Sequence, residues 1–303
     1  MILTLLLSVS IITAACSSNS AKEHAGHTSN SSVFMHVHGL GYSGDGERLF
    51  VPVHHGLSVY EGGAWNEVPG EKHDYMGFAP IDKGFYSSGH PAPGSDYKDP
   101  LGIVKSTDEG VSLEILSLEG EVDFHGLAAS FRDHTIYVLN PGPNSIMEEG
   151  GLYYSLDETK TWTRSNMEGV TDPITAFAVH PTDGSIIALG TTTGAYLSND
   201  YGQSFTKVSM DESVTALAIS DDGDLLIGTE EADAPLVELY VESGQIIEID
   251  IPLDSEDAIY YMAINPVNPS EITVATANKN IYLTPDNGTT WKQIADNGEM
   301  INE

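Results

Sequence analysis

From Val33 onward the chain alternates short apolar runs with turns rich in Gly, Asp, Asn and Ser. One such run is Thr175-Ala176-Phe177-Ala178, and comparable runs lie at 215–218 and 261–264. Short apolar runs bounded by turn residues are typical of β-strands rather than helices. Because these runs mix small and large apolar side chains, we expect them to form inner strands that crowd towards a central axis.

A turn pattern of the form Ser/Thr-x-Asp-x-Gly-x-Ser/Thr-Trp recurs between these strands. It is complete at 284–291, and altered copies lie at 106–113, 155–162 and 198–205. A short Asp side chain can accept hydrogen bonds from turn amides, and Gly supplies a positive-φ position. The ring at the end can then pack between neighbouring sheets. We therefore interpret the four turn aspartates as structural residues: Asp108, Asp157, Asp200 and Asp286.

The spacing of this pattern predicts the fold. Successive turn aspartates are 49, 43 and 86 positions apart, and the last interval is twice the one before it. Degenerate copies of the pattern at 61–65 and 241–245 bring the number of units to six. Repeats of this length are typical of propeller blades. We predict an all-β fold, a six-bladed β-propeller with four-stranded blades, over residues 33–303.

The repeated turn resembles the Asp-boxes, or bacterial neuraminidase repeats, of sialidase-like and sortilin-like β-propellers. Several sequence segments that are not repeated resemble those of a family of bacterial lipoproteins described as glycosyl-hydrolase-like. These segments lie at 36–41, 55–57, 73–78, 88–94 and 123–125. The resemblance implies a six-bladed propeller outside the cell. The hydrolase name follows the fold and does not establish an activity.

The N-terminus has the features of a bacterial lipoprotein signal. Residues 1–15 are predominantly apolar, contain no charged side chain and are too short to span a bilayer, and 12–16 resembles a lipobox that ends at Cys16. Cys16 is the single cysteine, so we interpret it as a lipid attachment site. Residues 16–32 are rich in Ser and small polar residues and are predicted to form a flexible tether. The protein is thus expected on the outer face of the cytoplasmic membrane, held only by its lipid anchor.

The charge of the chain restricts its partners. There are 45 acidic and 12 basic residues, giving a formal net charge of −33. Such a field repels nucleic acid and anionic membranes and attracts cations. Sialidases hold a substrate carboxylate with several arginines, whereas this chain has three, none expected near the axis: Arg48, Arg132 and Arg164. Sialidase activity is therefore not expected.

Histidines are concentrated in the first three blades. We predict metal ligands among His36, His38, His54, His73, His90 and His125. Alignment of the blades places His38, Asp74 and His125 at one inner-strand position, in one sector of the central mouth. Several imidazoles with carboxylates suit zinc or copper. The sequence therefore predicts a metal or small-ligand site there. The alternative is a polar, water-filled mouth whose histidines bind no metal.

Two other functions remain open. Asp74 and Asp123 provide a pair of carboxylates at the same mouth, so the protein could be a glycoside hydrolase acting on a neutral glycan. It could also be a scaffold for protein assembly in the cell envelope, as sortilin-like and photosystem-assembly propellers are. In each case we expect a monomer whose partner is a metal ion, a small ligand, a glycan or an envelope protein.

Overall fold

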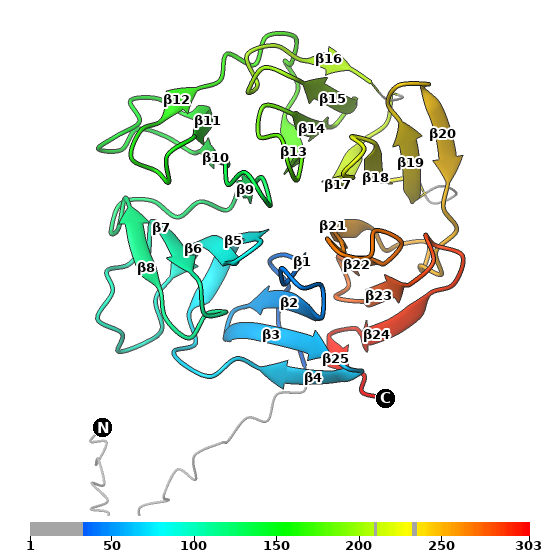
Figure 1. Cartoon of the computed structure of the whole chain (residues 1–303), viewed down its shortest axis with the longest axis horizontal. Helices are drawn as coiled ribbons and strands as arrows, with labels where there is room; N and C mark the ends of the chain where they lie inside the picture. The colour runs from blue at the N-terminus through cyan, green and yellow to red at the C-terminus, as the bar shows by residue number, and fades with distance from the viewer. Residues whose placement is uncertain (1–32, 209–210, 232–234) are drawn as a thin grey trace, which may run out of the picture. The chain divides into compact units, whose positions relative to one another are not determined.

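Six antiparallel sheets of four or five strands form a ring in the computed structural model (Figure 1). The structure describes residues 33–208, 211–231 and 235–303, and these residues include no helix. The chain is thus a six-bladed β-propeller, as the repeat spacing predicted. The expected signal segment, tether and Cys16 lie outside the described residues. No stretch with the length and hydrophobicity of a membrane-spanning helix occurs within the described ranges.

Strands follow one another in sequence order from the axis to the rim of each blade. The first blade contains β1 (Gly41–Tyr42), β2 (Arg48–Val53), β3 (Gly56–Glu61) and β4 (Ala64–Glu67). The second contains β5 (Asp74–Ile81), β6 (Gly84–His90), β7 (Ile103–Ser106) and β8 (Glu114–Ser117). The third contains β9 (Leu127–Ala129), β10 (Ile136–Asn140), β11 (Gly151–Ser155) and β12 (Thr163–Arg164).

The remaining three blades repeat this arrangement. The fourth contains β13 (Ile174–Val179), β14 (Ile187–Thr191), β15 (Gly194–Ser198) and β16 (Thr206–Lys207). The fifth contains β17 (Val214–Ile219), β18 (Leu225–Thr229), β19 (Leu236–Tyr240) and β20 (Gln245–Glu248). The sixth contains β21 (Ile259–Ile264), β22 (Ile272–Thr276), β23 (Ile281–Thr284), β24 (Lys292–Asp296) and a short fifth strand, β25 (Glu299–Met300).

The recurring Asp turns connect the third and fourth strands and are held by their own side chains. Asp286 Oδ1 accepts hydrogen bonds from the amide of Thr290 at 2.8 Å and from Thr284 Oγ1 at 2.9 Å. The Thr290 hydroxyl donates to Asp286 Oδ2 at 2.8 Å. Asp108, Asp157 and Asp200 have the same set of partners. These carboxylates are therefore engaged within their own turns.

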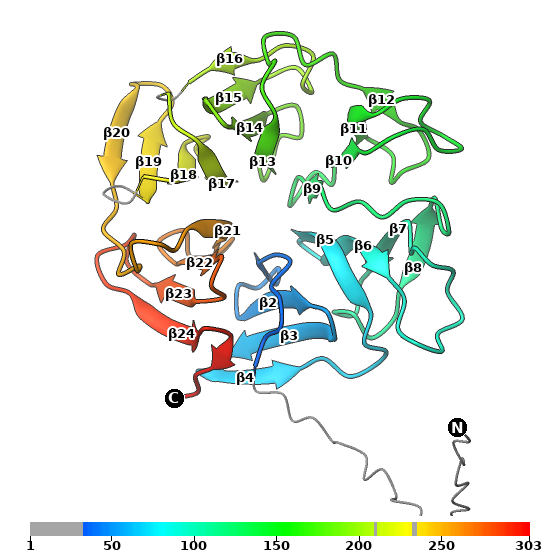
Figure 2. The same cartoon turned by 180° about the vertical axis from the view of Figure 1, so that it is seen from behind.

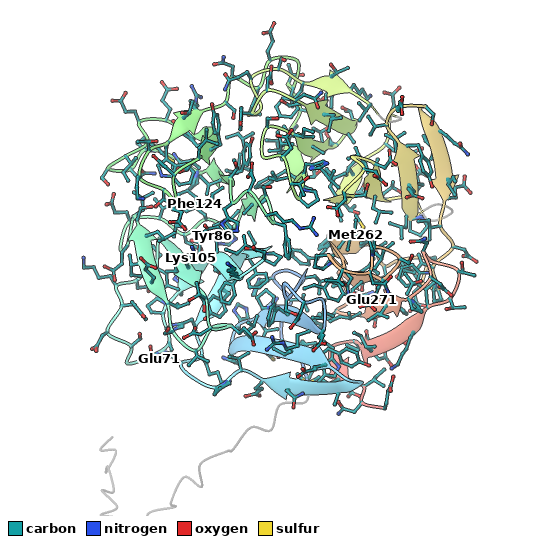
Figure 3. All side chains as sticks on the ribbon, in the orientation of Figure 1. Glu71, Tyr86, Lys105, Phe124, Met262 and Glu271 are labelled. Atoms are coloured by element: carbon teal, nitrogen blue, oxygen red, sulfur yellow. The ribbon has the colours of Figure 1, made fainter. Side chains whose placement is uncertain are left out.

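Where the turn pattern ends in an aromatic residue, that residue packs against the preceding blade. Trp291 lies against the apolar cluster of the fifth and sixth blades, and its Nε1 donates to the carbonyl of Asp250 at 2.8 Å. Trp162 similarly contacts the cluster between the second and third blades, which contains Tyr86 and Phe124 (Figure 3). A large ring at this position fills the gap between adjacent sheets and so fixes the turn to the neighbouring blade.

The ring closes where the first described residues meet the last blade. Val33 forms an antiparallel bridge with Glu299, and the Phe34 amide donates to the carbonyl of Gly298 at 2.7 Å. The amide of Glu303 donates to the carbonyl of Gly63 at 3.0 Å. Both views of the fold show the first and sixth blades side by side (Figure 2).

A central cavity of about 610 Å³ lies within the ring of inner strands. Contrary to the sequence expectation, one arginine reaches it. Arg132 follows β9, and its guanidinium bonds to Asp221 of the fifth blade at 3.2 Å and to the carbonyl of Pro266 of the sixth blade at 3.1 Å. All three residues follow the last residue of an inner strand. The guanidinium thus spans the end of the cavity at which the inner strands finish.

Candidate metal centre

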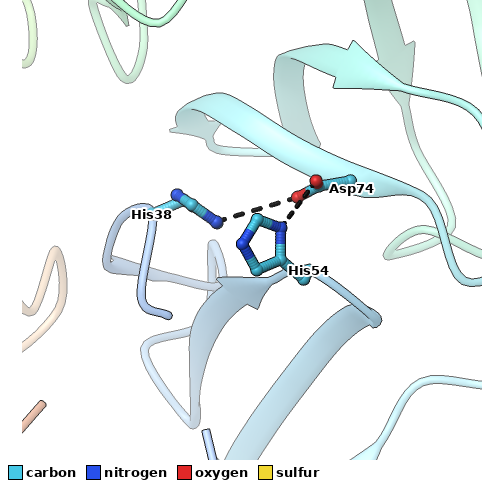
Figure 4. Close-up of side chains that lie close together, drawn as sticks. All are labelled: His38, His54 and Asp74. Carbon is cyan, nitrogen blue, oxygen red and sulfur yellow. Dashed lines mark hydrogen bonds and ion pairs between the residues drawn. The ribbon is translucent and has the colours of Figure 1, made fainter. Parts of the chain in front are cut away.

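Three side chains of the first two blades converge at the opposite end of the cavity (Figure 4). His38 precedes β1 and lines the cavity, His54 follows β2, and Asp74 is the first residue of β5. Each offers a ligand atom, and these atoms all lie within 4.8 Å of one another. Among the described residues, no other group of His, Cys, Asp or Glu side chains meets this condition.

The backbone fixes the positions of these side chains. The His38 amide donates to the carbonyl of Pro52 at 3.0 Å, which holds the segment before β1 alongside β2. The pairing of β5 with β6 shifts between Tyr75 and Gly77, which leaves Asp74 opposite His90. Such a bulge re-aims the side chains beside it.

His54 and Asp74 form the tightest contact of the group. His54 Nδ1 lies 2.6 Å from Asp74 Oδ2. Because a carboxylate only accepts hydrogen bonds, the proton of this contact belongs to Nδ1 of the imidazole. A neutral His54 therefore keeps the lone pair of Nε2 free for another partner.

His38 and Asp74 present two buried polar atoms to each other without a hydrogen bond. His38 Nε2 and Asp74 Oδ1 are 3.7 Å apart, beyond hydrogen-bond distance, and neither has another partner. A buried polar atom without a partner is unfavourable, typically by about 1–3 kcal/mol. An ion about 2.1 Å from both atoms would satisfy them at an angle of roughly 120° between its ligands, near the angles of four-coordinate zinc.

The surroundings of His38 favour its neutral form. Burial lowers the pKa of His38, and nearby His54, His36 and His125 lower it further against the opposing effect of Asp74. A neutral imidazole has the free lone pair that a metal ligand needs.

His36 adds a further imidazole at the edge of the group. Its ring is stacked on that of His38 with centroids 6.0 Å apart, as expected for residues two apart on one face of an extended segment. The His36 and His54 centroids are 4.7 Å apart. His36 is exposed, so its ring can turn towards an ion held by the other three residues.

His90 and His125 gather around a different carboxylate, Asp123. Asp123 Oδ2 is 2.7 Å from His125 Nε2 and 3.4 Å from His90 Nε2. His90 Nδ1 also lies 2.6 Å from Asp99 Oδ1. These carboxylates, chiefly Asp99 by accepting a hydrogen bond from His90 Nδ1, raise the pKa of His90. The contact between Asp99 and His90 was not predicted from the sequence, because Asp99 lies in the loop after β6, nine residues beyond the histidine.

His73 lies outside both groups. Its side chain is buried beside Tyr75 and Tyr97, and its Nδ1 accepts a hydrogen bond from the Ala92 amide at 3.0 Å. Burial also lowers the pKa of His73. Since neighbouring residues of an extended strand point to opposite faces, His73 faces away from the side of the sheet on which Asp74 lies. Its contacts are those of a structural histidine that supports the loop after β6.

The bulges also correct the blade alignment made from the sequence. Where the inner strand of a blade pairs with the second strand, one residue has no partner on the second strand. This residue is Met76 in β5, Thr175 in β13 and Thr215 in β17. Met76, rather than Asp74, therefore occupies the position of these threonines. Asp74 lies two residues earlier but on the same face of the strand, which is why it still reaches His38.

No family model and no curated protein matches this chain. Solved structures do match its fold. A GH74 enzyme from Niastella koreensis has a TM-score of 0.58 and 16% identity over 86% of this chain and 45% of that chain. YCF48 bound to D1 peptide has a TM-score of 0.52 and 13% identity over 86% and 81% of the two chains.

An extracellular domain from B. thetaiotaomicron, that of the two-component system BT4673, is a third match. Its TM-score is 0.53 at 18% identity, over 87% of this chain and 34% of that chain. The propeller thus spans less than half of the GH74 enzyme and of the BT4673 chain. At these identities the likenesses show the β-propeller fold alone.

Proposed function

We propose that this propeller is a binding protein that holds a transition-metal ion, Zn²⁺ or Cu²⁺, between His38, His54 and Asp74. The observation that carries the proposal is the buried pair His38 Nε2 and Asp74 Oδ1, 3.7 Å apart and without hydrogen-bond partners. A metal ion between them would satisfy both atoms at once.

The donor set suits this ion. Two imidazoles and one carboxylate are a common ligand set for zinc and leave at least one coordination position open. His36 can fill that position, or a small ligand entering from the central cavity can, since His38 lines that cavity. The formal charge of −33 also raises the local concentration of cations around the protein.

We further propose that the propeller is displayed on the outer face of a bacterial cytoplasmic membrane through a lipid on Cys16. The support is the sequence of residues 1–16 alone. A metal-binding propeller in this position would capture or buffer the ion outside the cell.

The glycosidase alternative is less well supported. Asp74 and Asp123 both contact imidazoles, and the remaining oxygen of each, Oδ1, is buried. A glycan would need open access to both carboxyl groups, whereas an ion smaller than water can sit between buried ligand atoms. An envelope-assembly role is favoured by one observation, that YCF48, which has the same fold, is described as bound to a peptide.

Elemental analysis after dialysis against zinc or copper tests the metal site. We use a full-length background with His24→Ala and His27→Ala, because these tether histidines offer a competing site. The proposal predicts an equivalent of metal per chain that is lost on His38→Ala or His54→Ala. The matched control is His55→Ala, an exposed neighbour outside the cluster, which should keep its metal. Metal content that is indifferent to His38 and His54 would overturn the proposal.

A further inference from the structure

We propose that the mouth holds a second metal ion, bound by His90, Asp123 and His125 and adjacent to the first. The inference rests on the proposed function, since it extends the same mouth from one ion to two. It is carried by the contacts of two imidazoles, His90 and His125, with the carboxylate of Asp123, none of which the first site uses. This group is more open than the first, so it closes around an ion only when the exposed His125 ring turns.

Asp99 orients the first ligand of this site. His90 Nδ1 lies 2.6 Å from Asp99 Oδ1, so the proton of that contact is on Nδ1. In a neutral His90, the lone pair of Nε2 then points towards Asp123 Oδ2 at 3.4 Å. A lone pair and a carboxylate oxygen repel each other unless a proton or a metal ion lies between them, and a bound metal ion would take the place of that proton. A carboxylate behind a histidine is the usual arrangement that fixes a metal-bound imidazole.

Asp123 and His125 supply the remaining ligands. Asp123 Oδ2 is the oxygen that both imidazoles face, whereas Oδ1 is buried and has no hydrogen-bond partner. The His125 side chain is 67% exposed and already contacts Asp123 Oδ2 through Nε2. A rotation of this ring would bring Nε2 onto the ion that His90 and Asp123 hold, and most of the side chain is exposed to solvent.

The two sites are neighbours on one sheet. Asp74 and His90 are paired residues of β5 and β6, and side chains paired in this way have Cβ atoms about 5 Å apart. Asp74 is a ligand of the first site and His90 of the second. The carboxylates of Asp74, Asp99 and Asp123 offset much of the charge of two divalent ions so close together.

Metal stoichiometry of the full-length protein tests this inference, in the background that lacks His24 and His27. We expect two equivalents of Zn²⁺ per chain, one equivalent in His90→Ala, one in His38→Ala and none in the double variant. Asp99→Asn should weaken the second equivalent 10- to 100-fold, the usual effect of losing such an orienting carboxylate. Asp96→Asn, an exposed change in the same loop, is its matched control.

With Cu²⁺ in place of zinc, electron paramagnetic resonance should show dipolar coupling between two ions in the parent protein, and none in His90→Ala. The contrary result is a parent protein that binds one equivalent of metal, lost in His38→Ala but kept in His90→Ala and Asp99→Asn. That result would overturn the second site and leave the first intact. If the parent protein binds no metal, both proposals are wrong. Because Asp99→Asn changes an exposed side chain, it keeps the test decisive even if His90→Ala folds poorly.

Discussion

Single residues at the mouth differ in how readily they bind a proton. His38 is half-buried among other imidazoles, and burial lowers its pKa. His90 is more exposed, and its pKa is raised, mainly by the hydrogen bond that it donates to Asp99. The same residue type is therefore suited to two tasks, a neutral ligand in the first case and an oriented, carboxylate-bound imidazole in the second.

Nuclear magnetic resonance titration of the histidine rings in metal-free protein measures this difference. We predict that His38 loses its proton below the ordinary histidine pKa and His90 above it. Because the folded pKa of His90 is raised, its contribution to stability is present below pH 6.5 and is lost as the pH rises through the folded value. Asp99→Asn should return the His90 pKa towards its ordinary value. Equal titration of both rings would contradict this account.

At the level of strands, the sequence predicted the architecture but not its irregularities. Apolar alternation, turn residues and a repeat of about 45 positions were enough to predict six four-stranded blades. The bulge after Tyr75 leaves no signal in a single sequence. The resulting alignment error of two positions is also hidden, because a shift of two positions keeps the alternation of side chains between the two faces. Asp74 was therefore assigned to the right face of the mouth but to the wrong position along its strand.

The histidine cluster could likewise be predicted only in part. Position in the repeat was enough to expect His36, His38 and His54 together, and the structure brings them together. Position in the repeat could not exclude His73 from the metal ligands. The burial of His73 under the loop after β6 depends on contacts with Tyr97 and Ala92, which lie far along the chain.

Close packing between the second and third blades leads to a stability prediction. A Cβ at Gly77 would lie 2.2 Å from the carbonyl oxygen of Phe124, a backbone atom that cannot turn aside. We expect Gly77→Ala to lower the free energy of unfolding by about 2–3 kcal/mol, as overpacking does in dense interiors. Gly142→Ala is the control, since no atom lies within 4 Å of its added Cβ. Urea denaturation measures the stability of the two variants. Equal midpoints for Gly77→Ala and Gly142→Ala would contradict close packing between Gly77 and Phe124.

At the scale of the whole molecule, the proposed lipid on Cys16 would hold a strongly acidic propeller at the membrane. We predict that Cys16→Ser moves the protein from the membrane fraction to the soluble fraction when it is expressed in a bacterium that processes lipoproteins. Ser20→Ala, in the same predicted tether, should leave the distribution unchanged. Fractionation with immunoblotting measures the distribution. A Cys16→Ser protein that stays with the membrane would contradict lipid attachment at this residue.

The central claim is that the mouth of the propeller is a metal site, and anomalous diffraction at the zinc edge from crystals of the zinc-loaded protein tests it most directly. The account predicts a peak about 2.1 Å from His38 Nε2, from a ring nitrogen of His54 and from an oxygen of Asp74. A zinc-loaded crystal without a peak between these three side chains would contradict it.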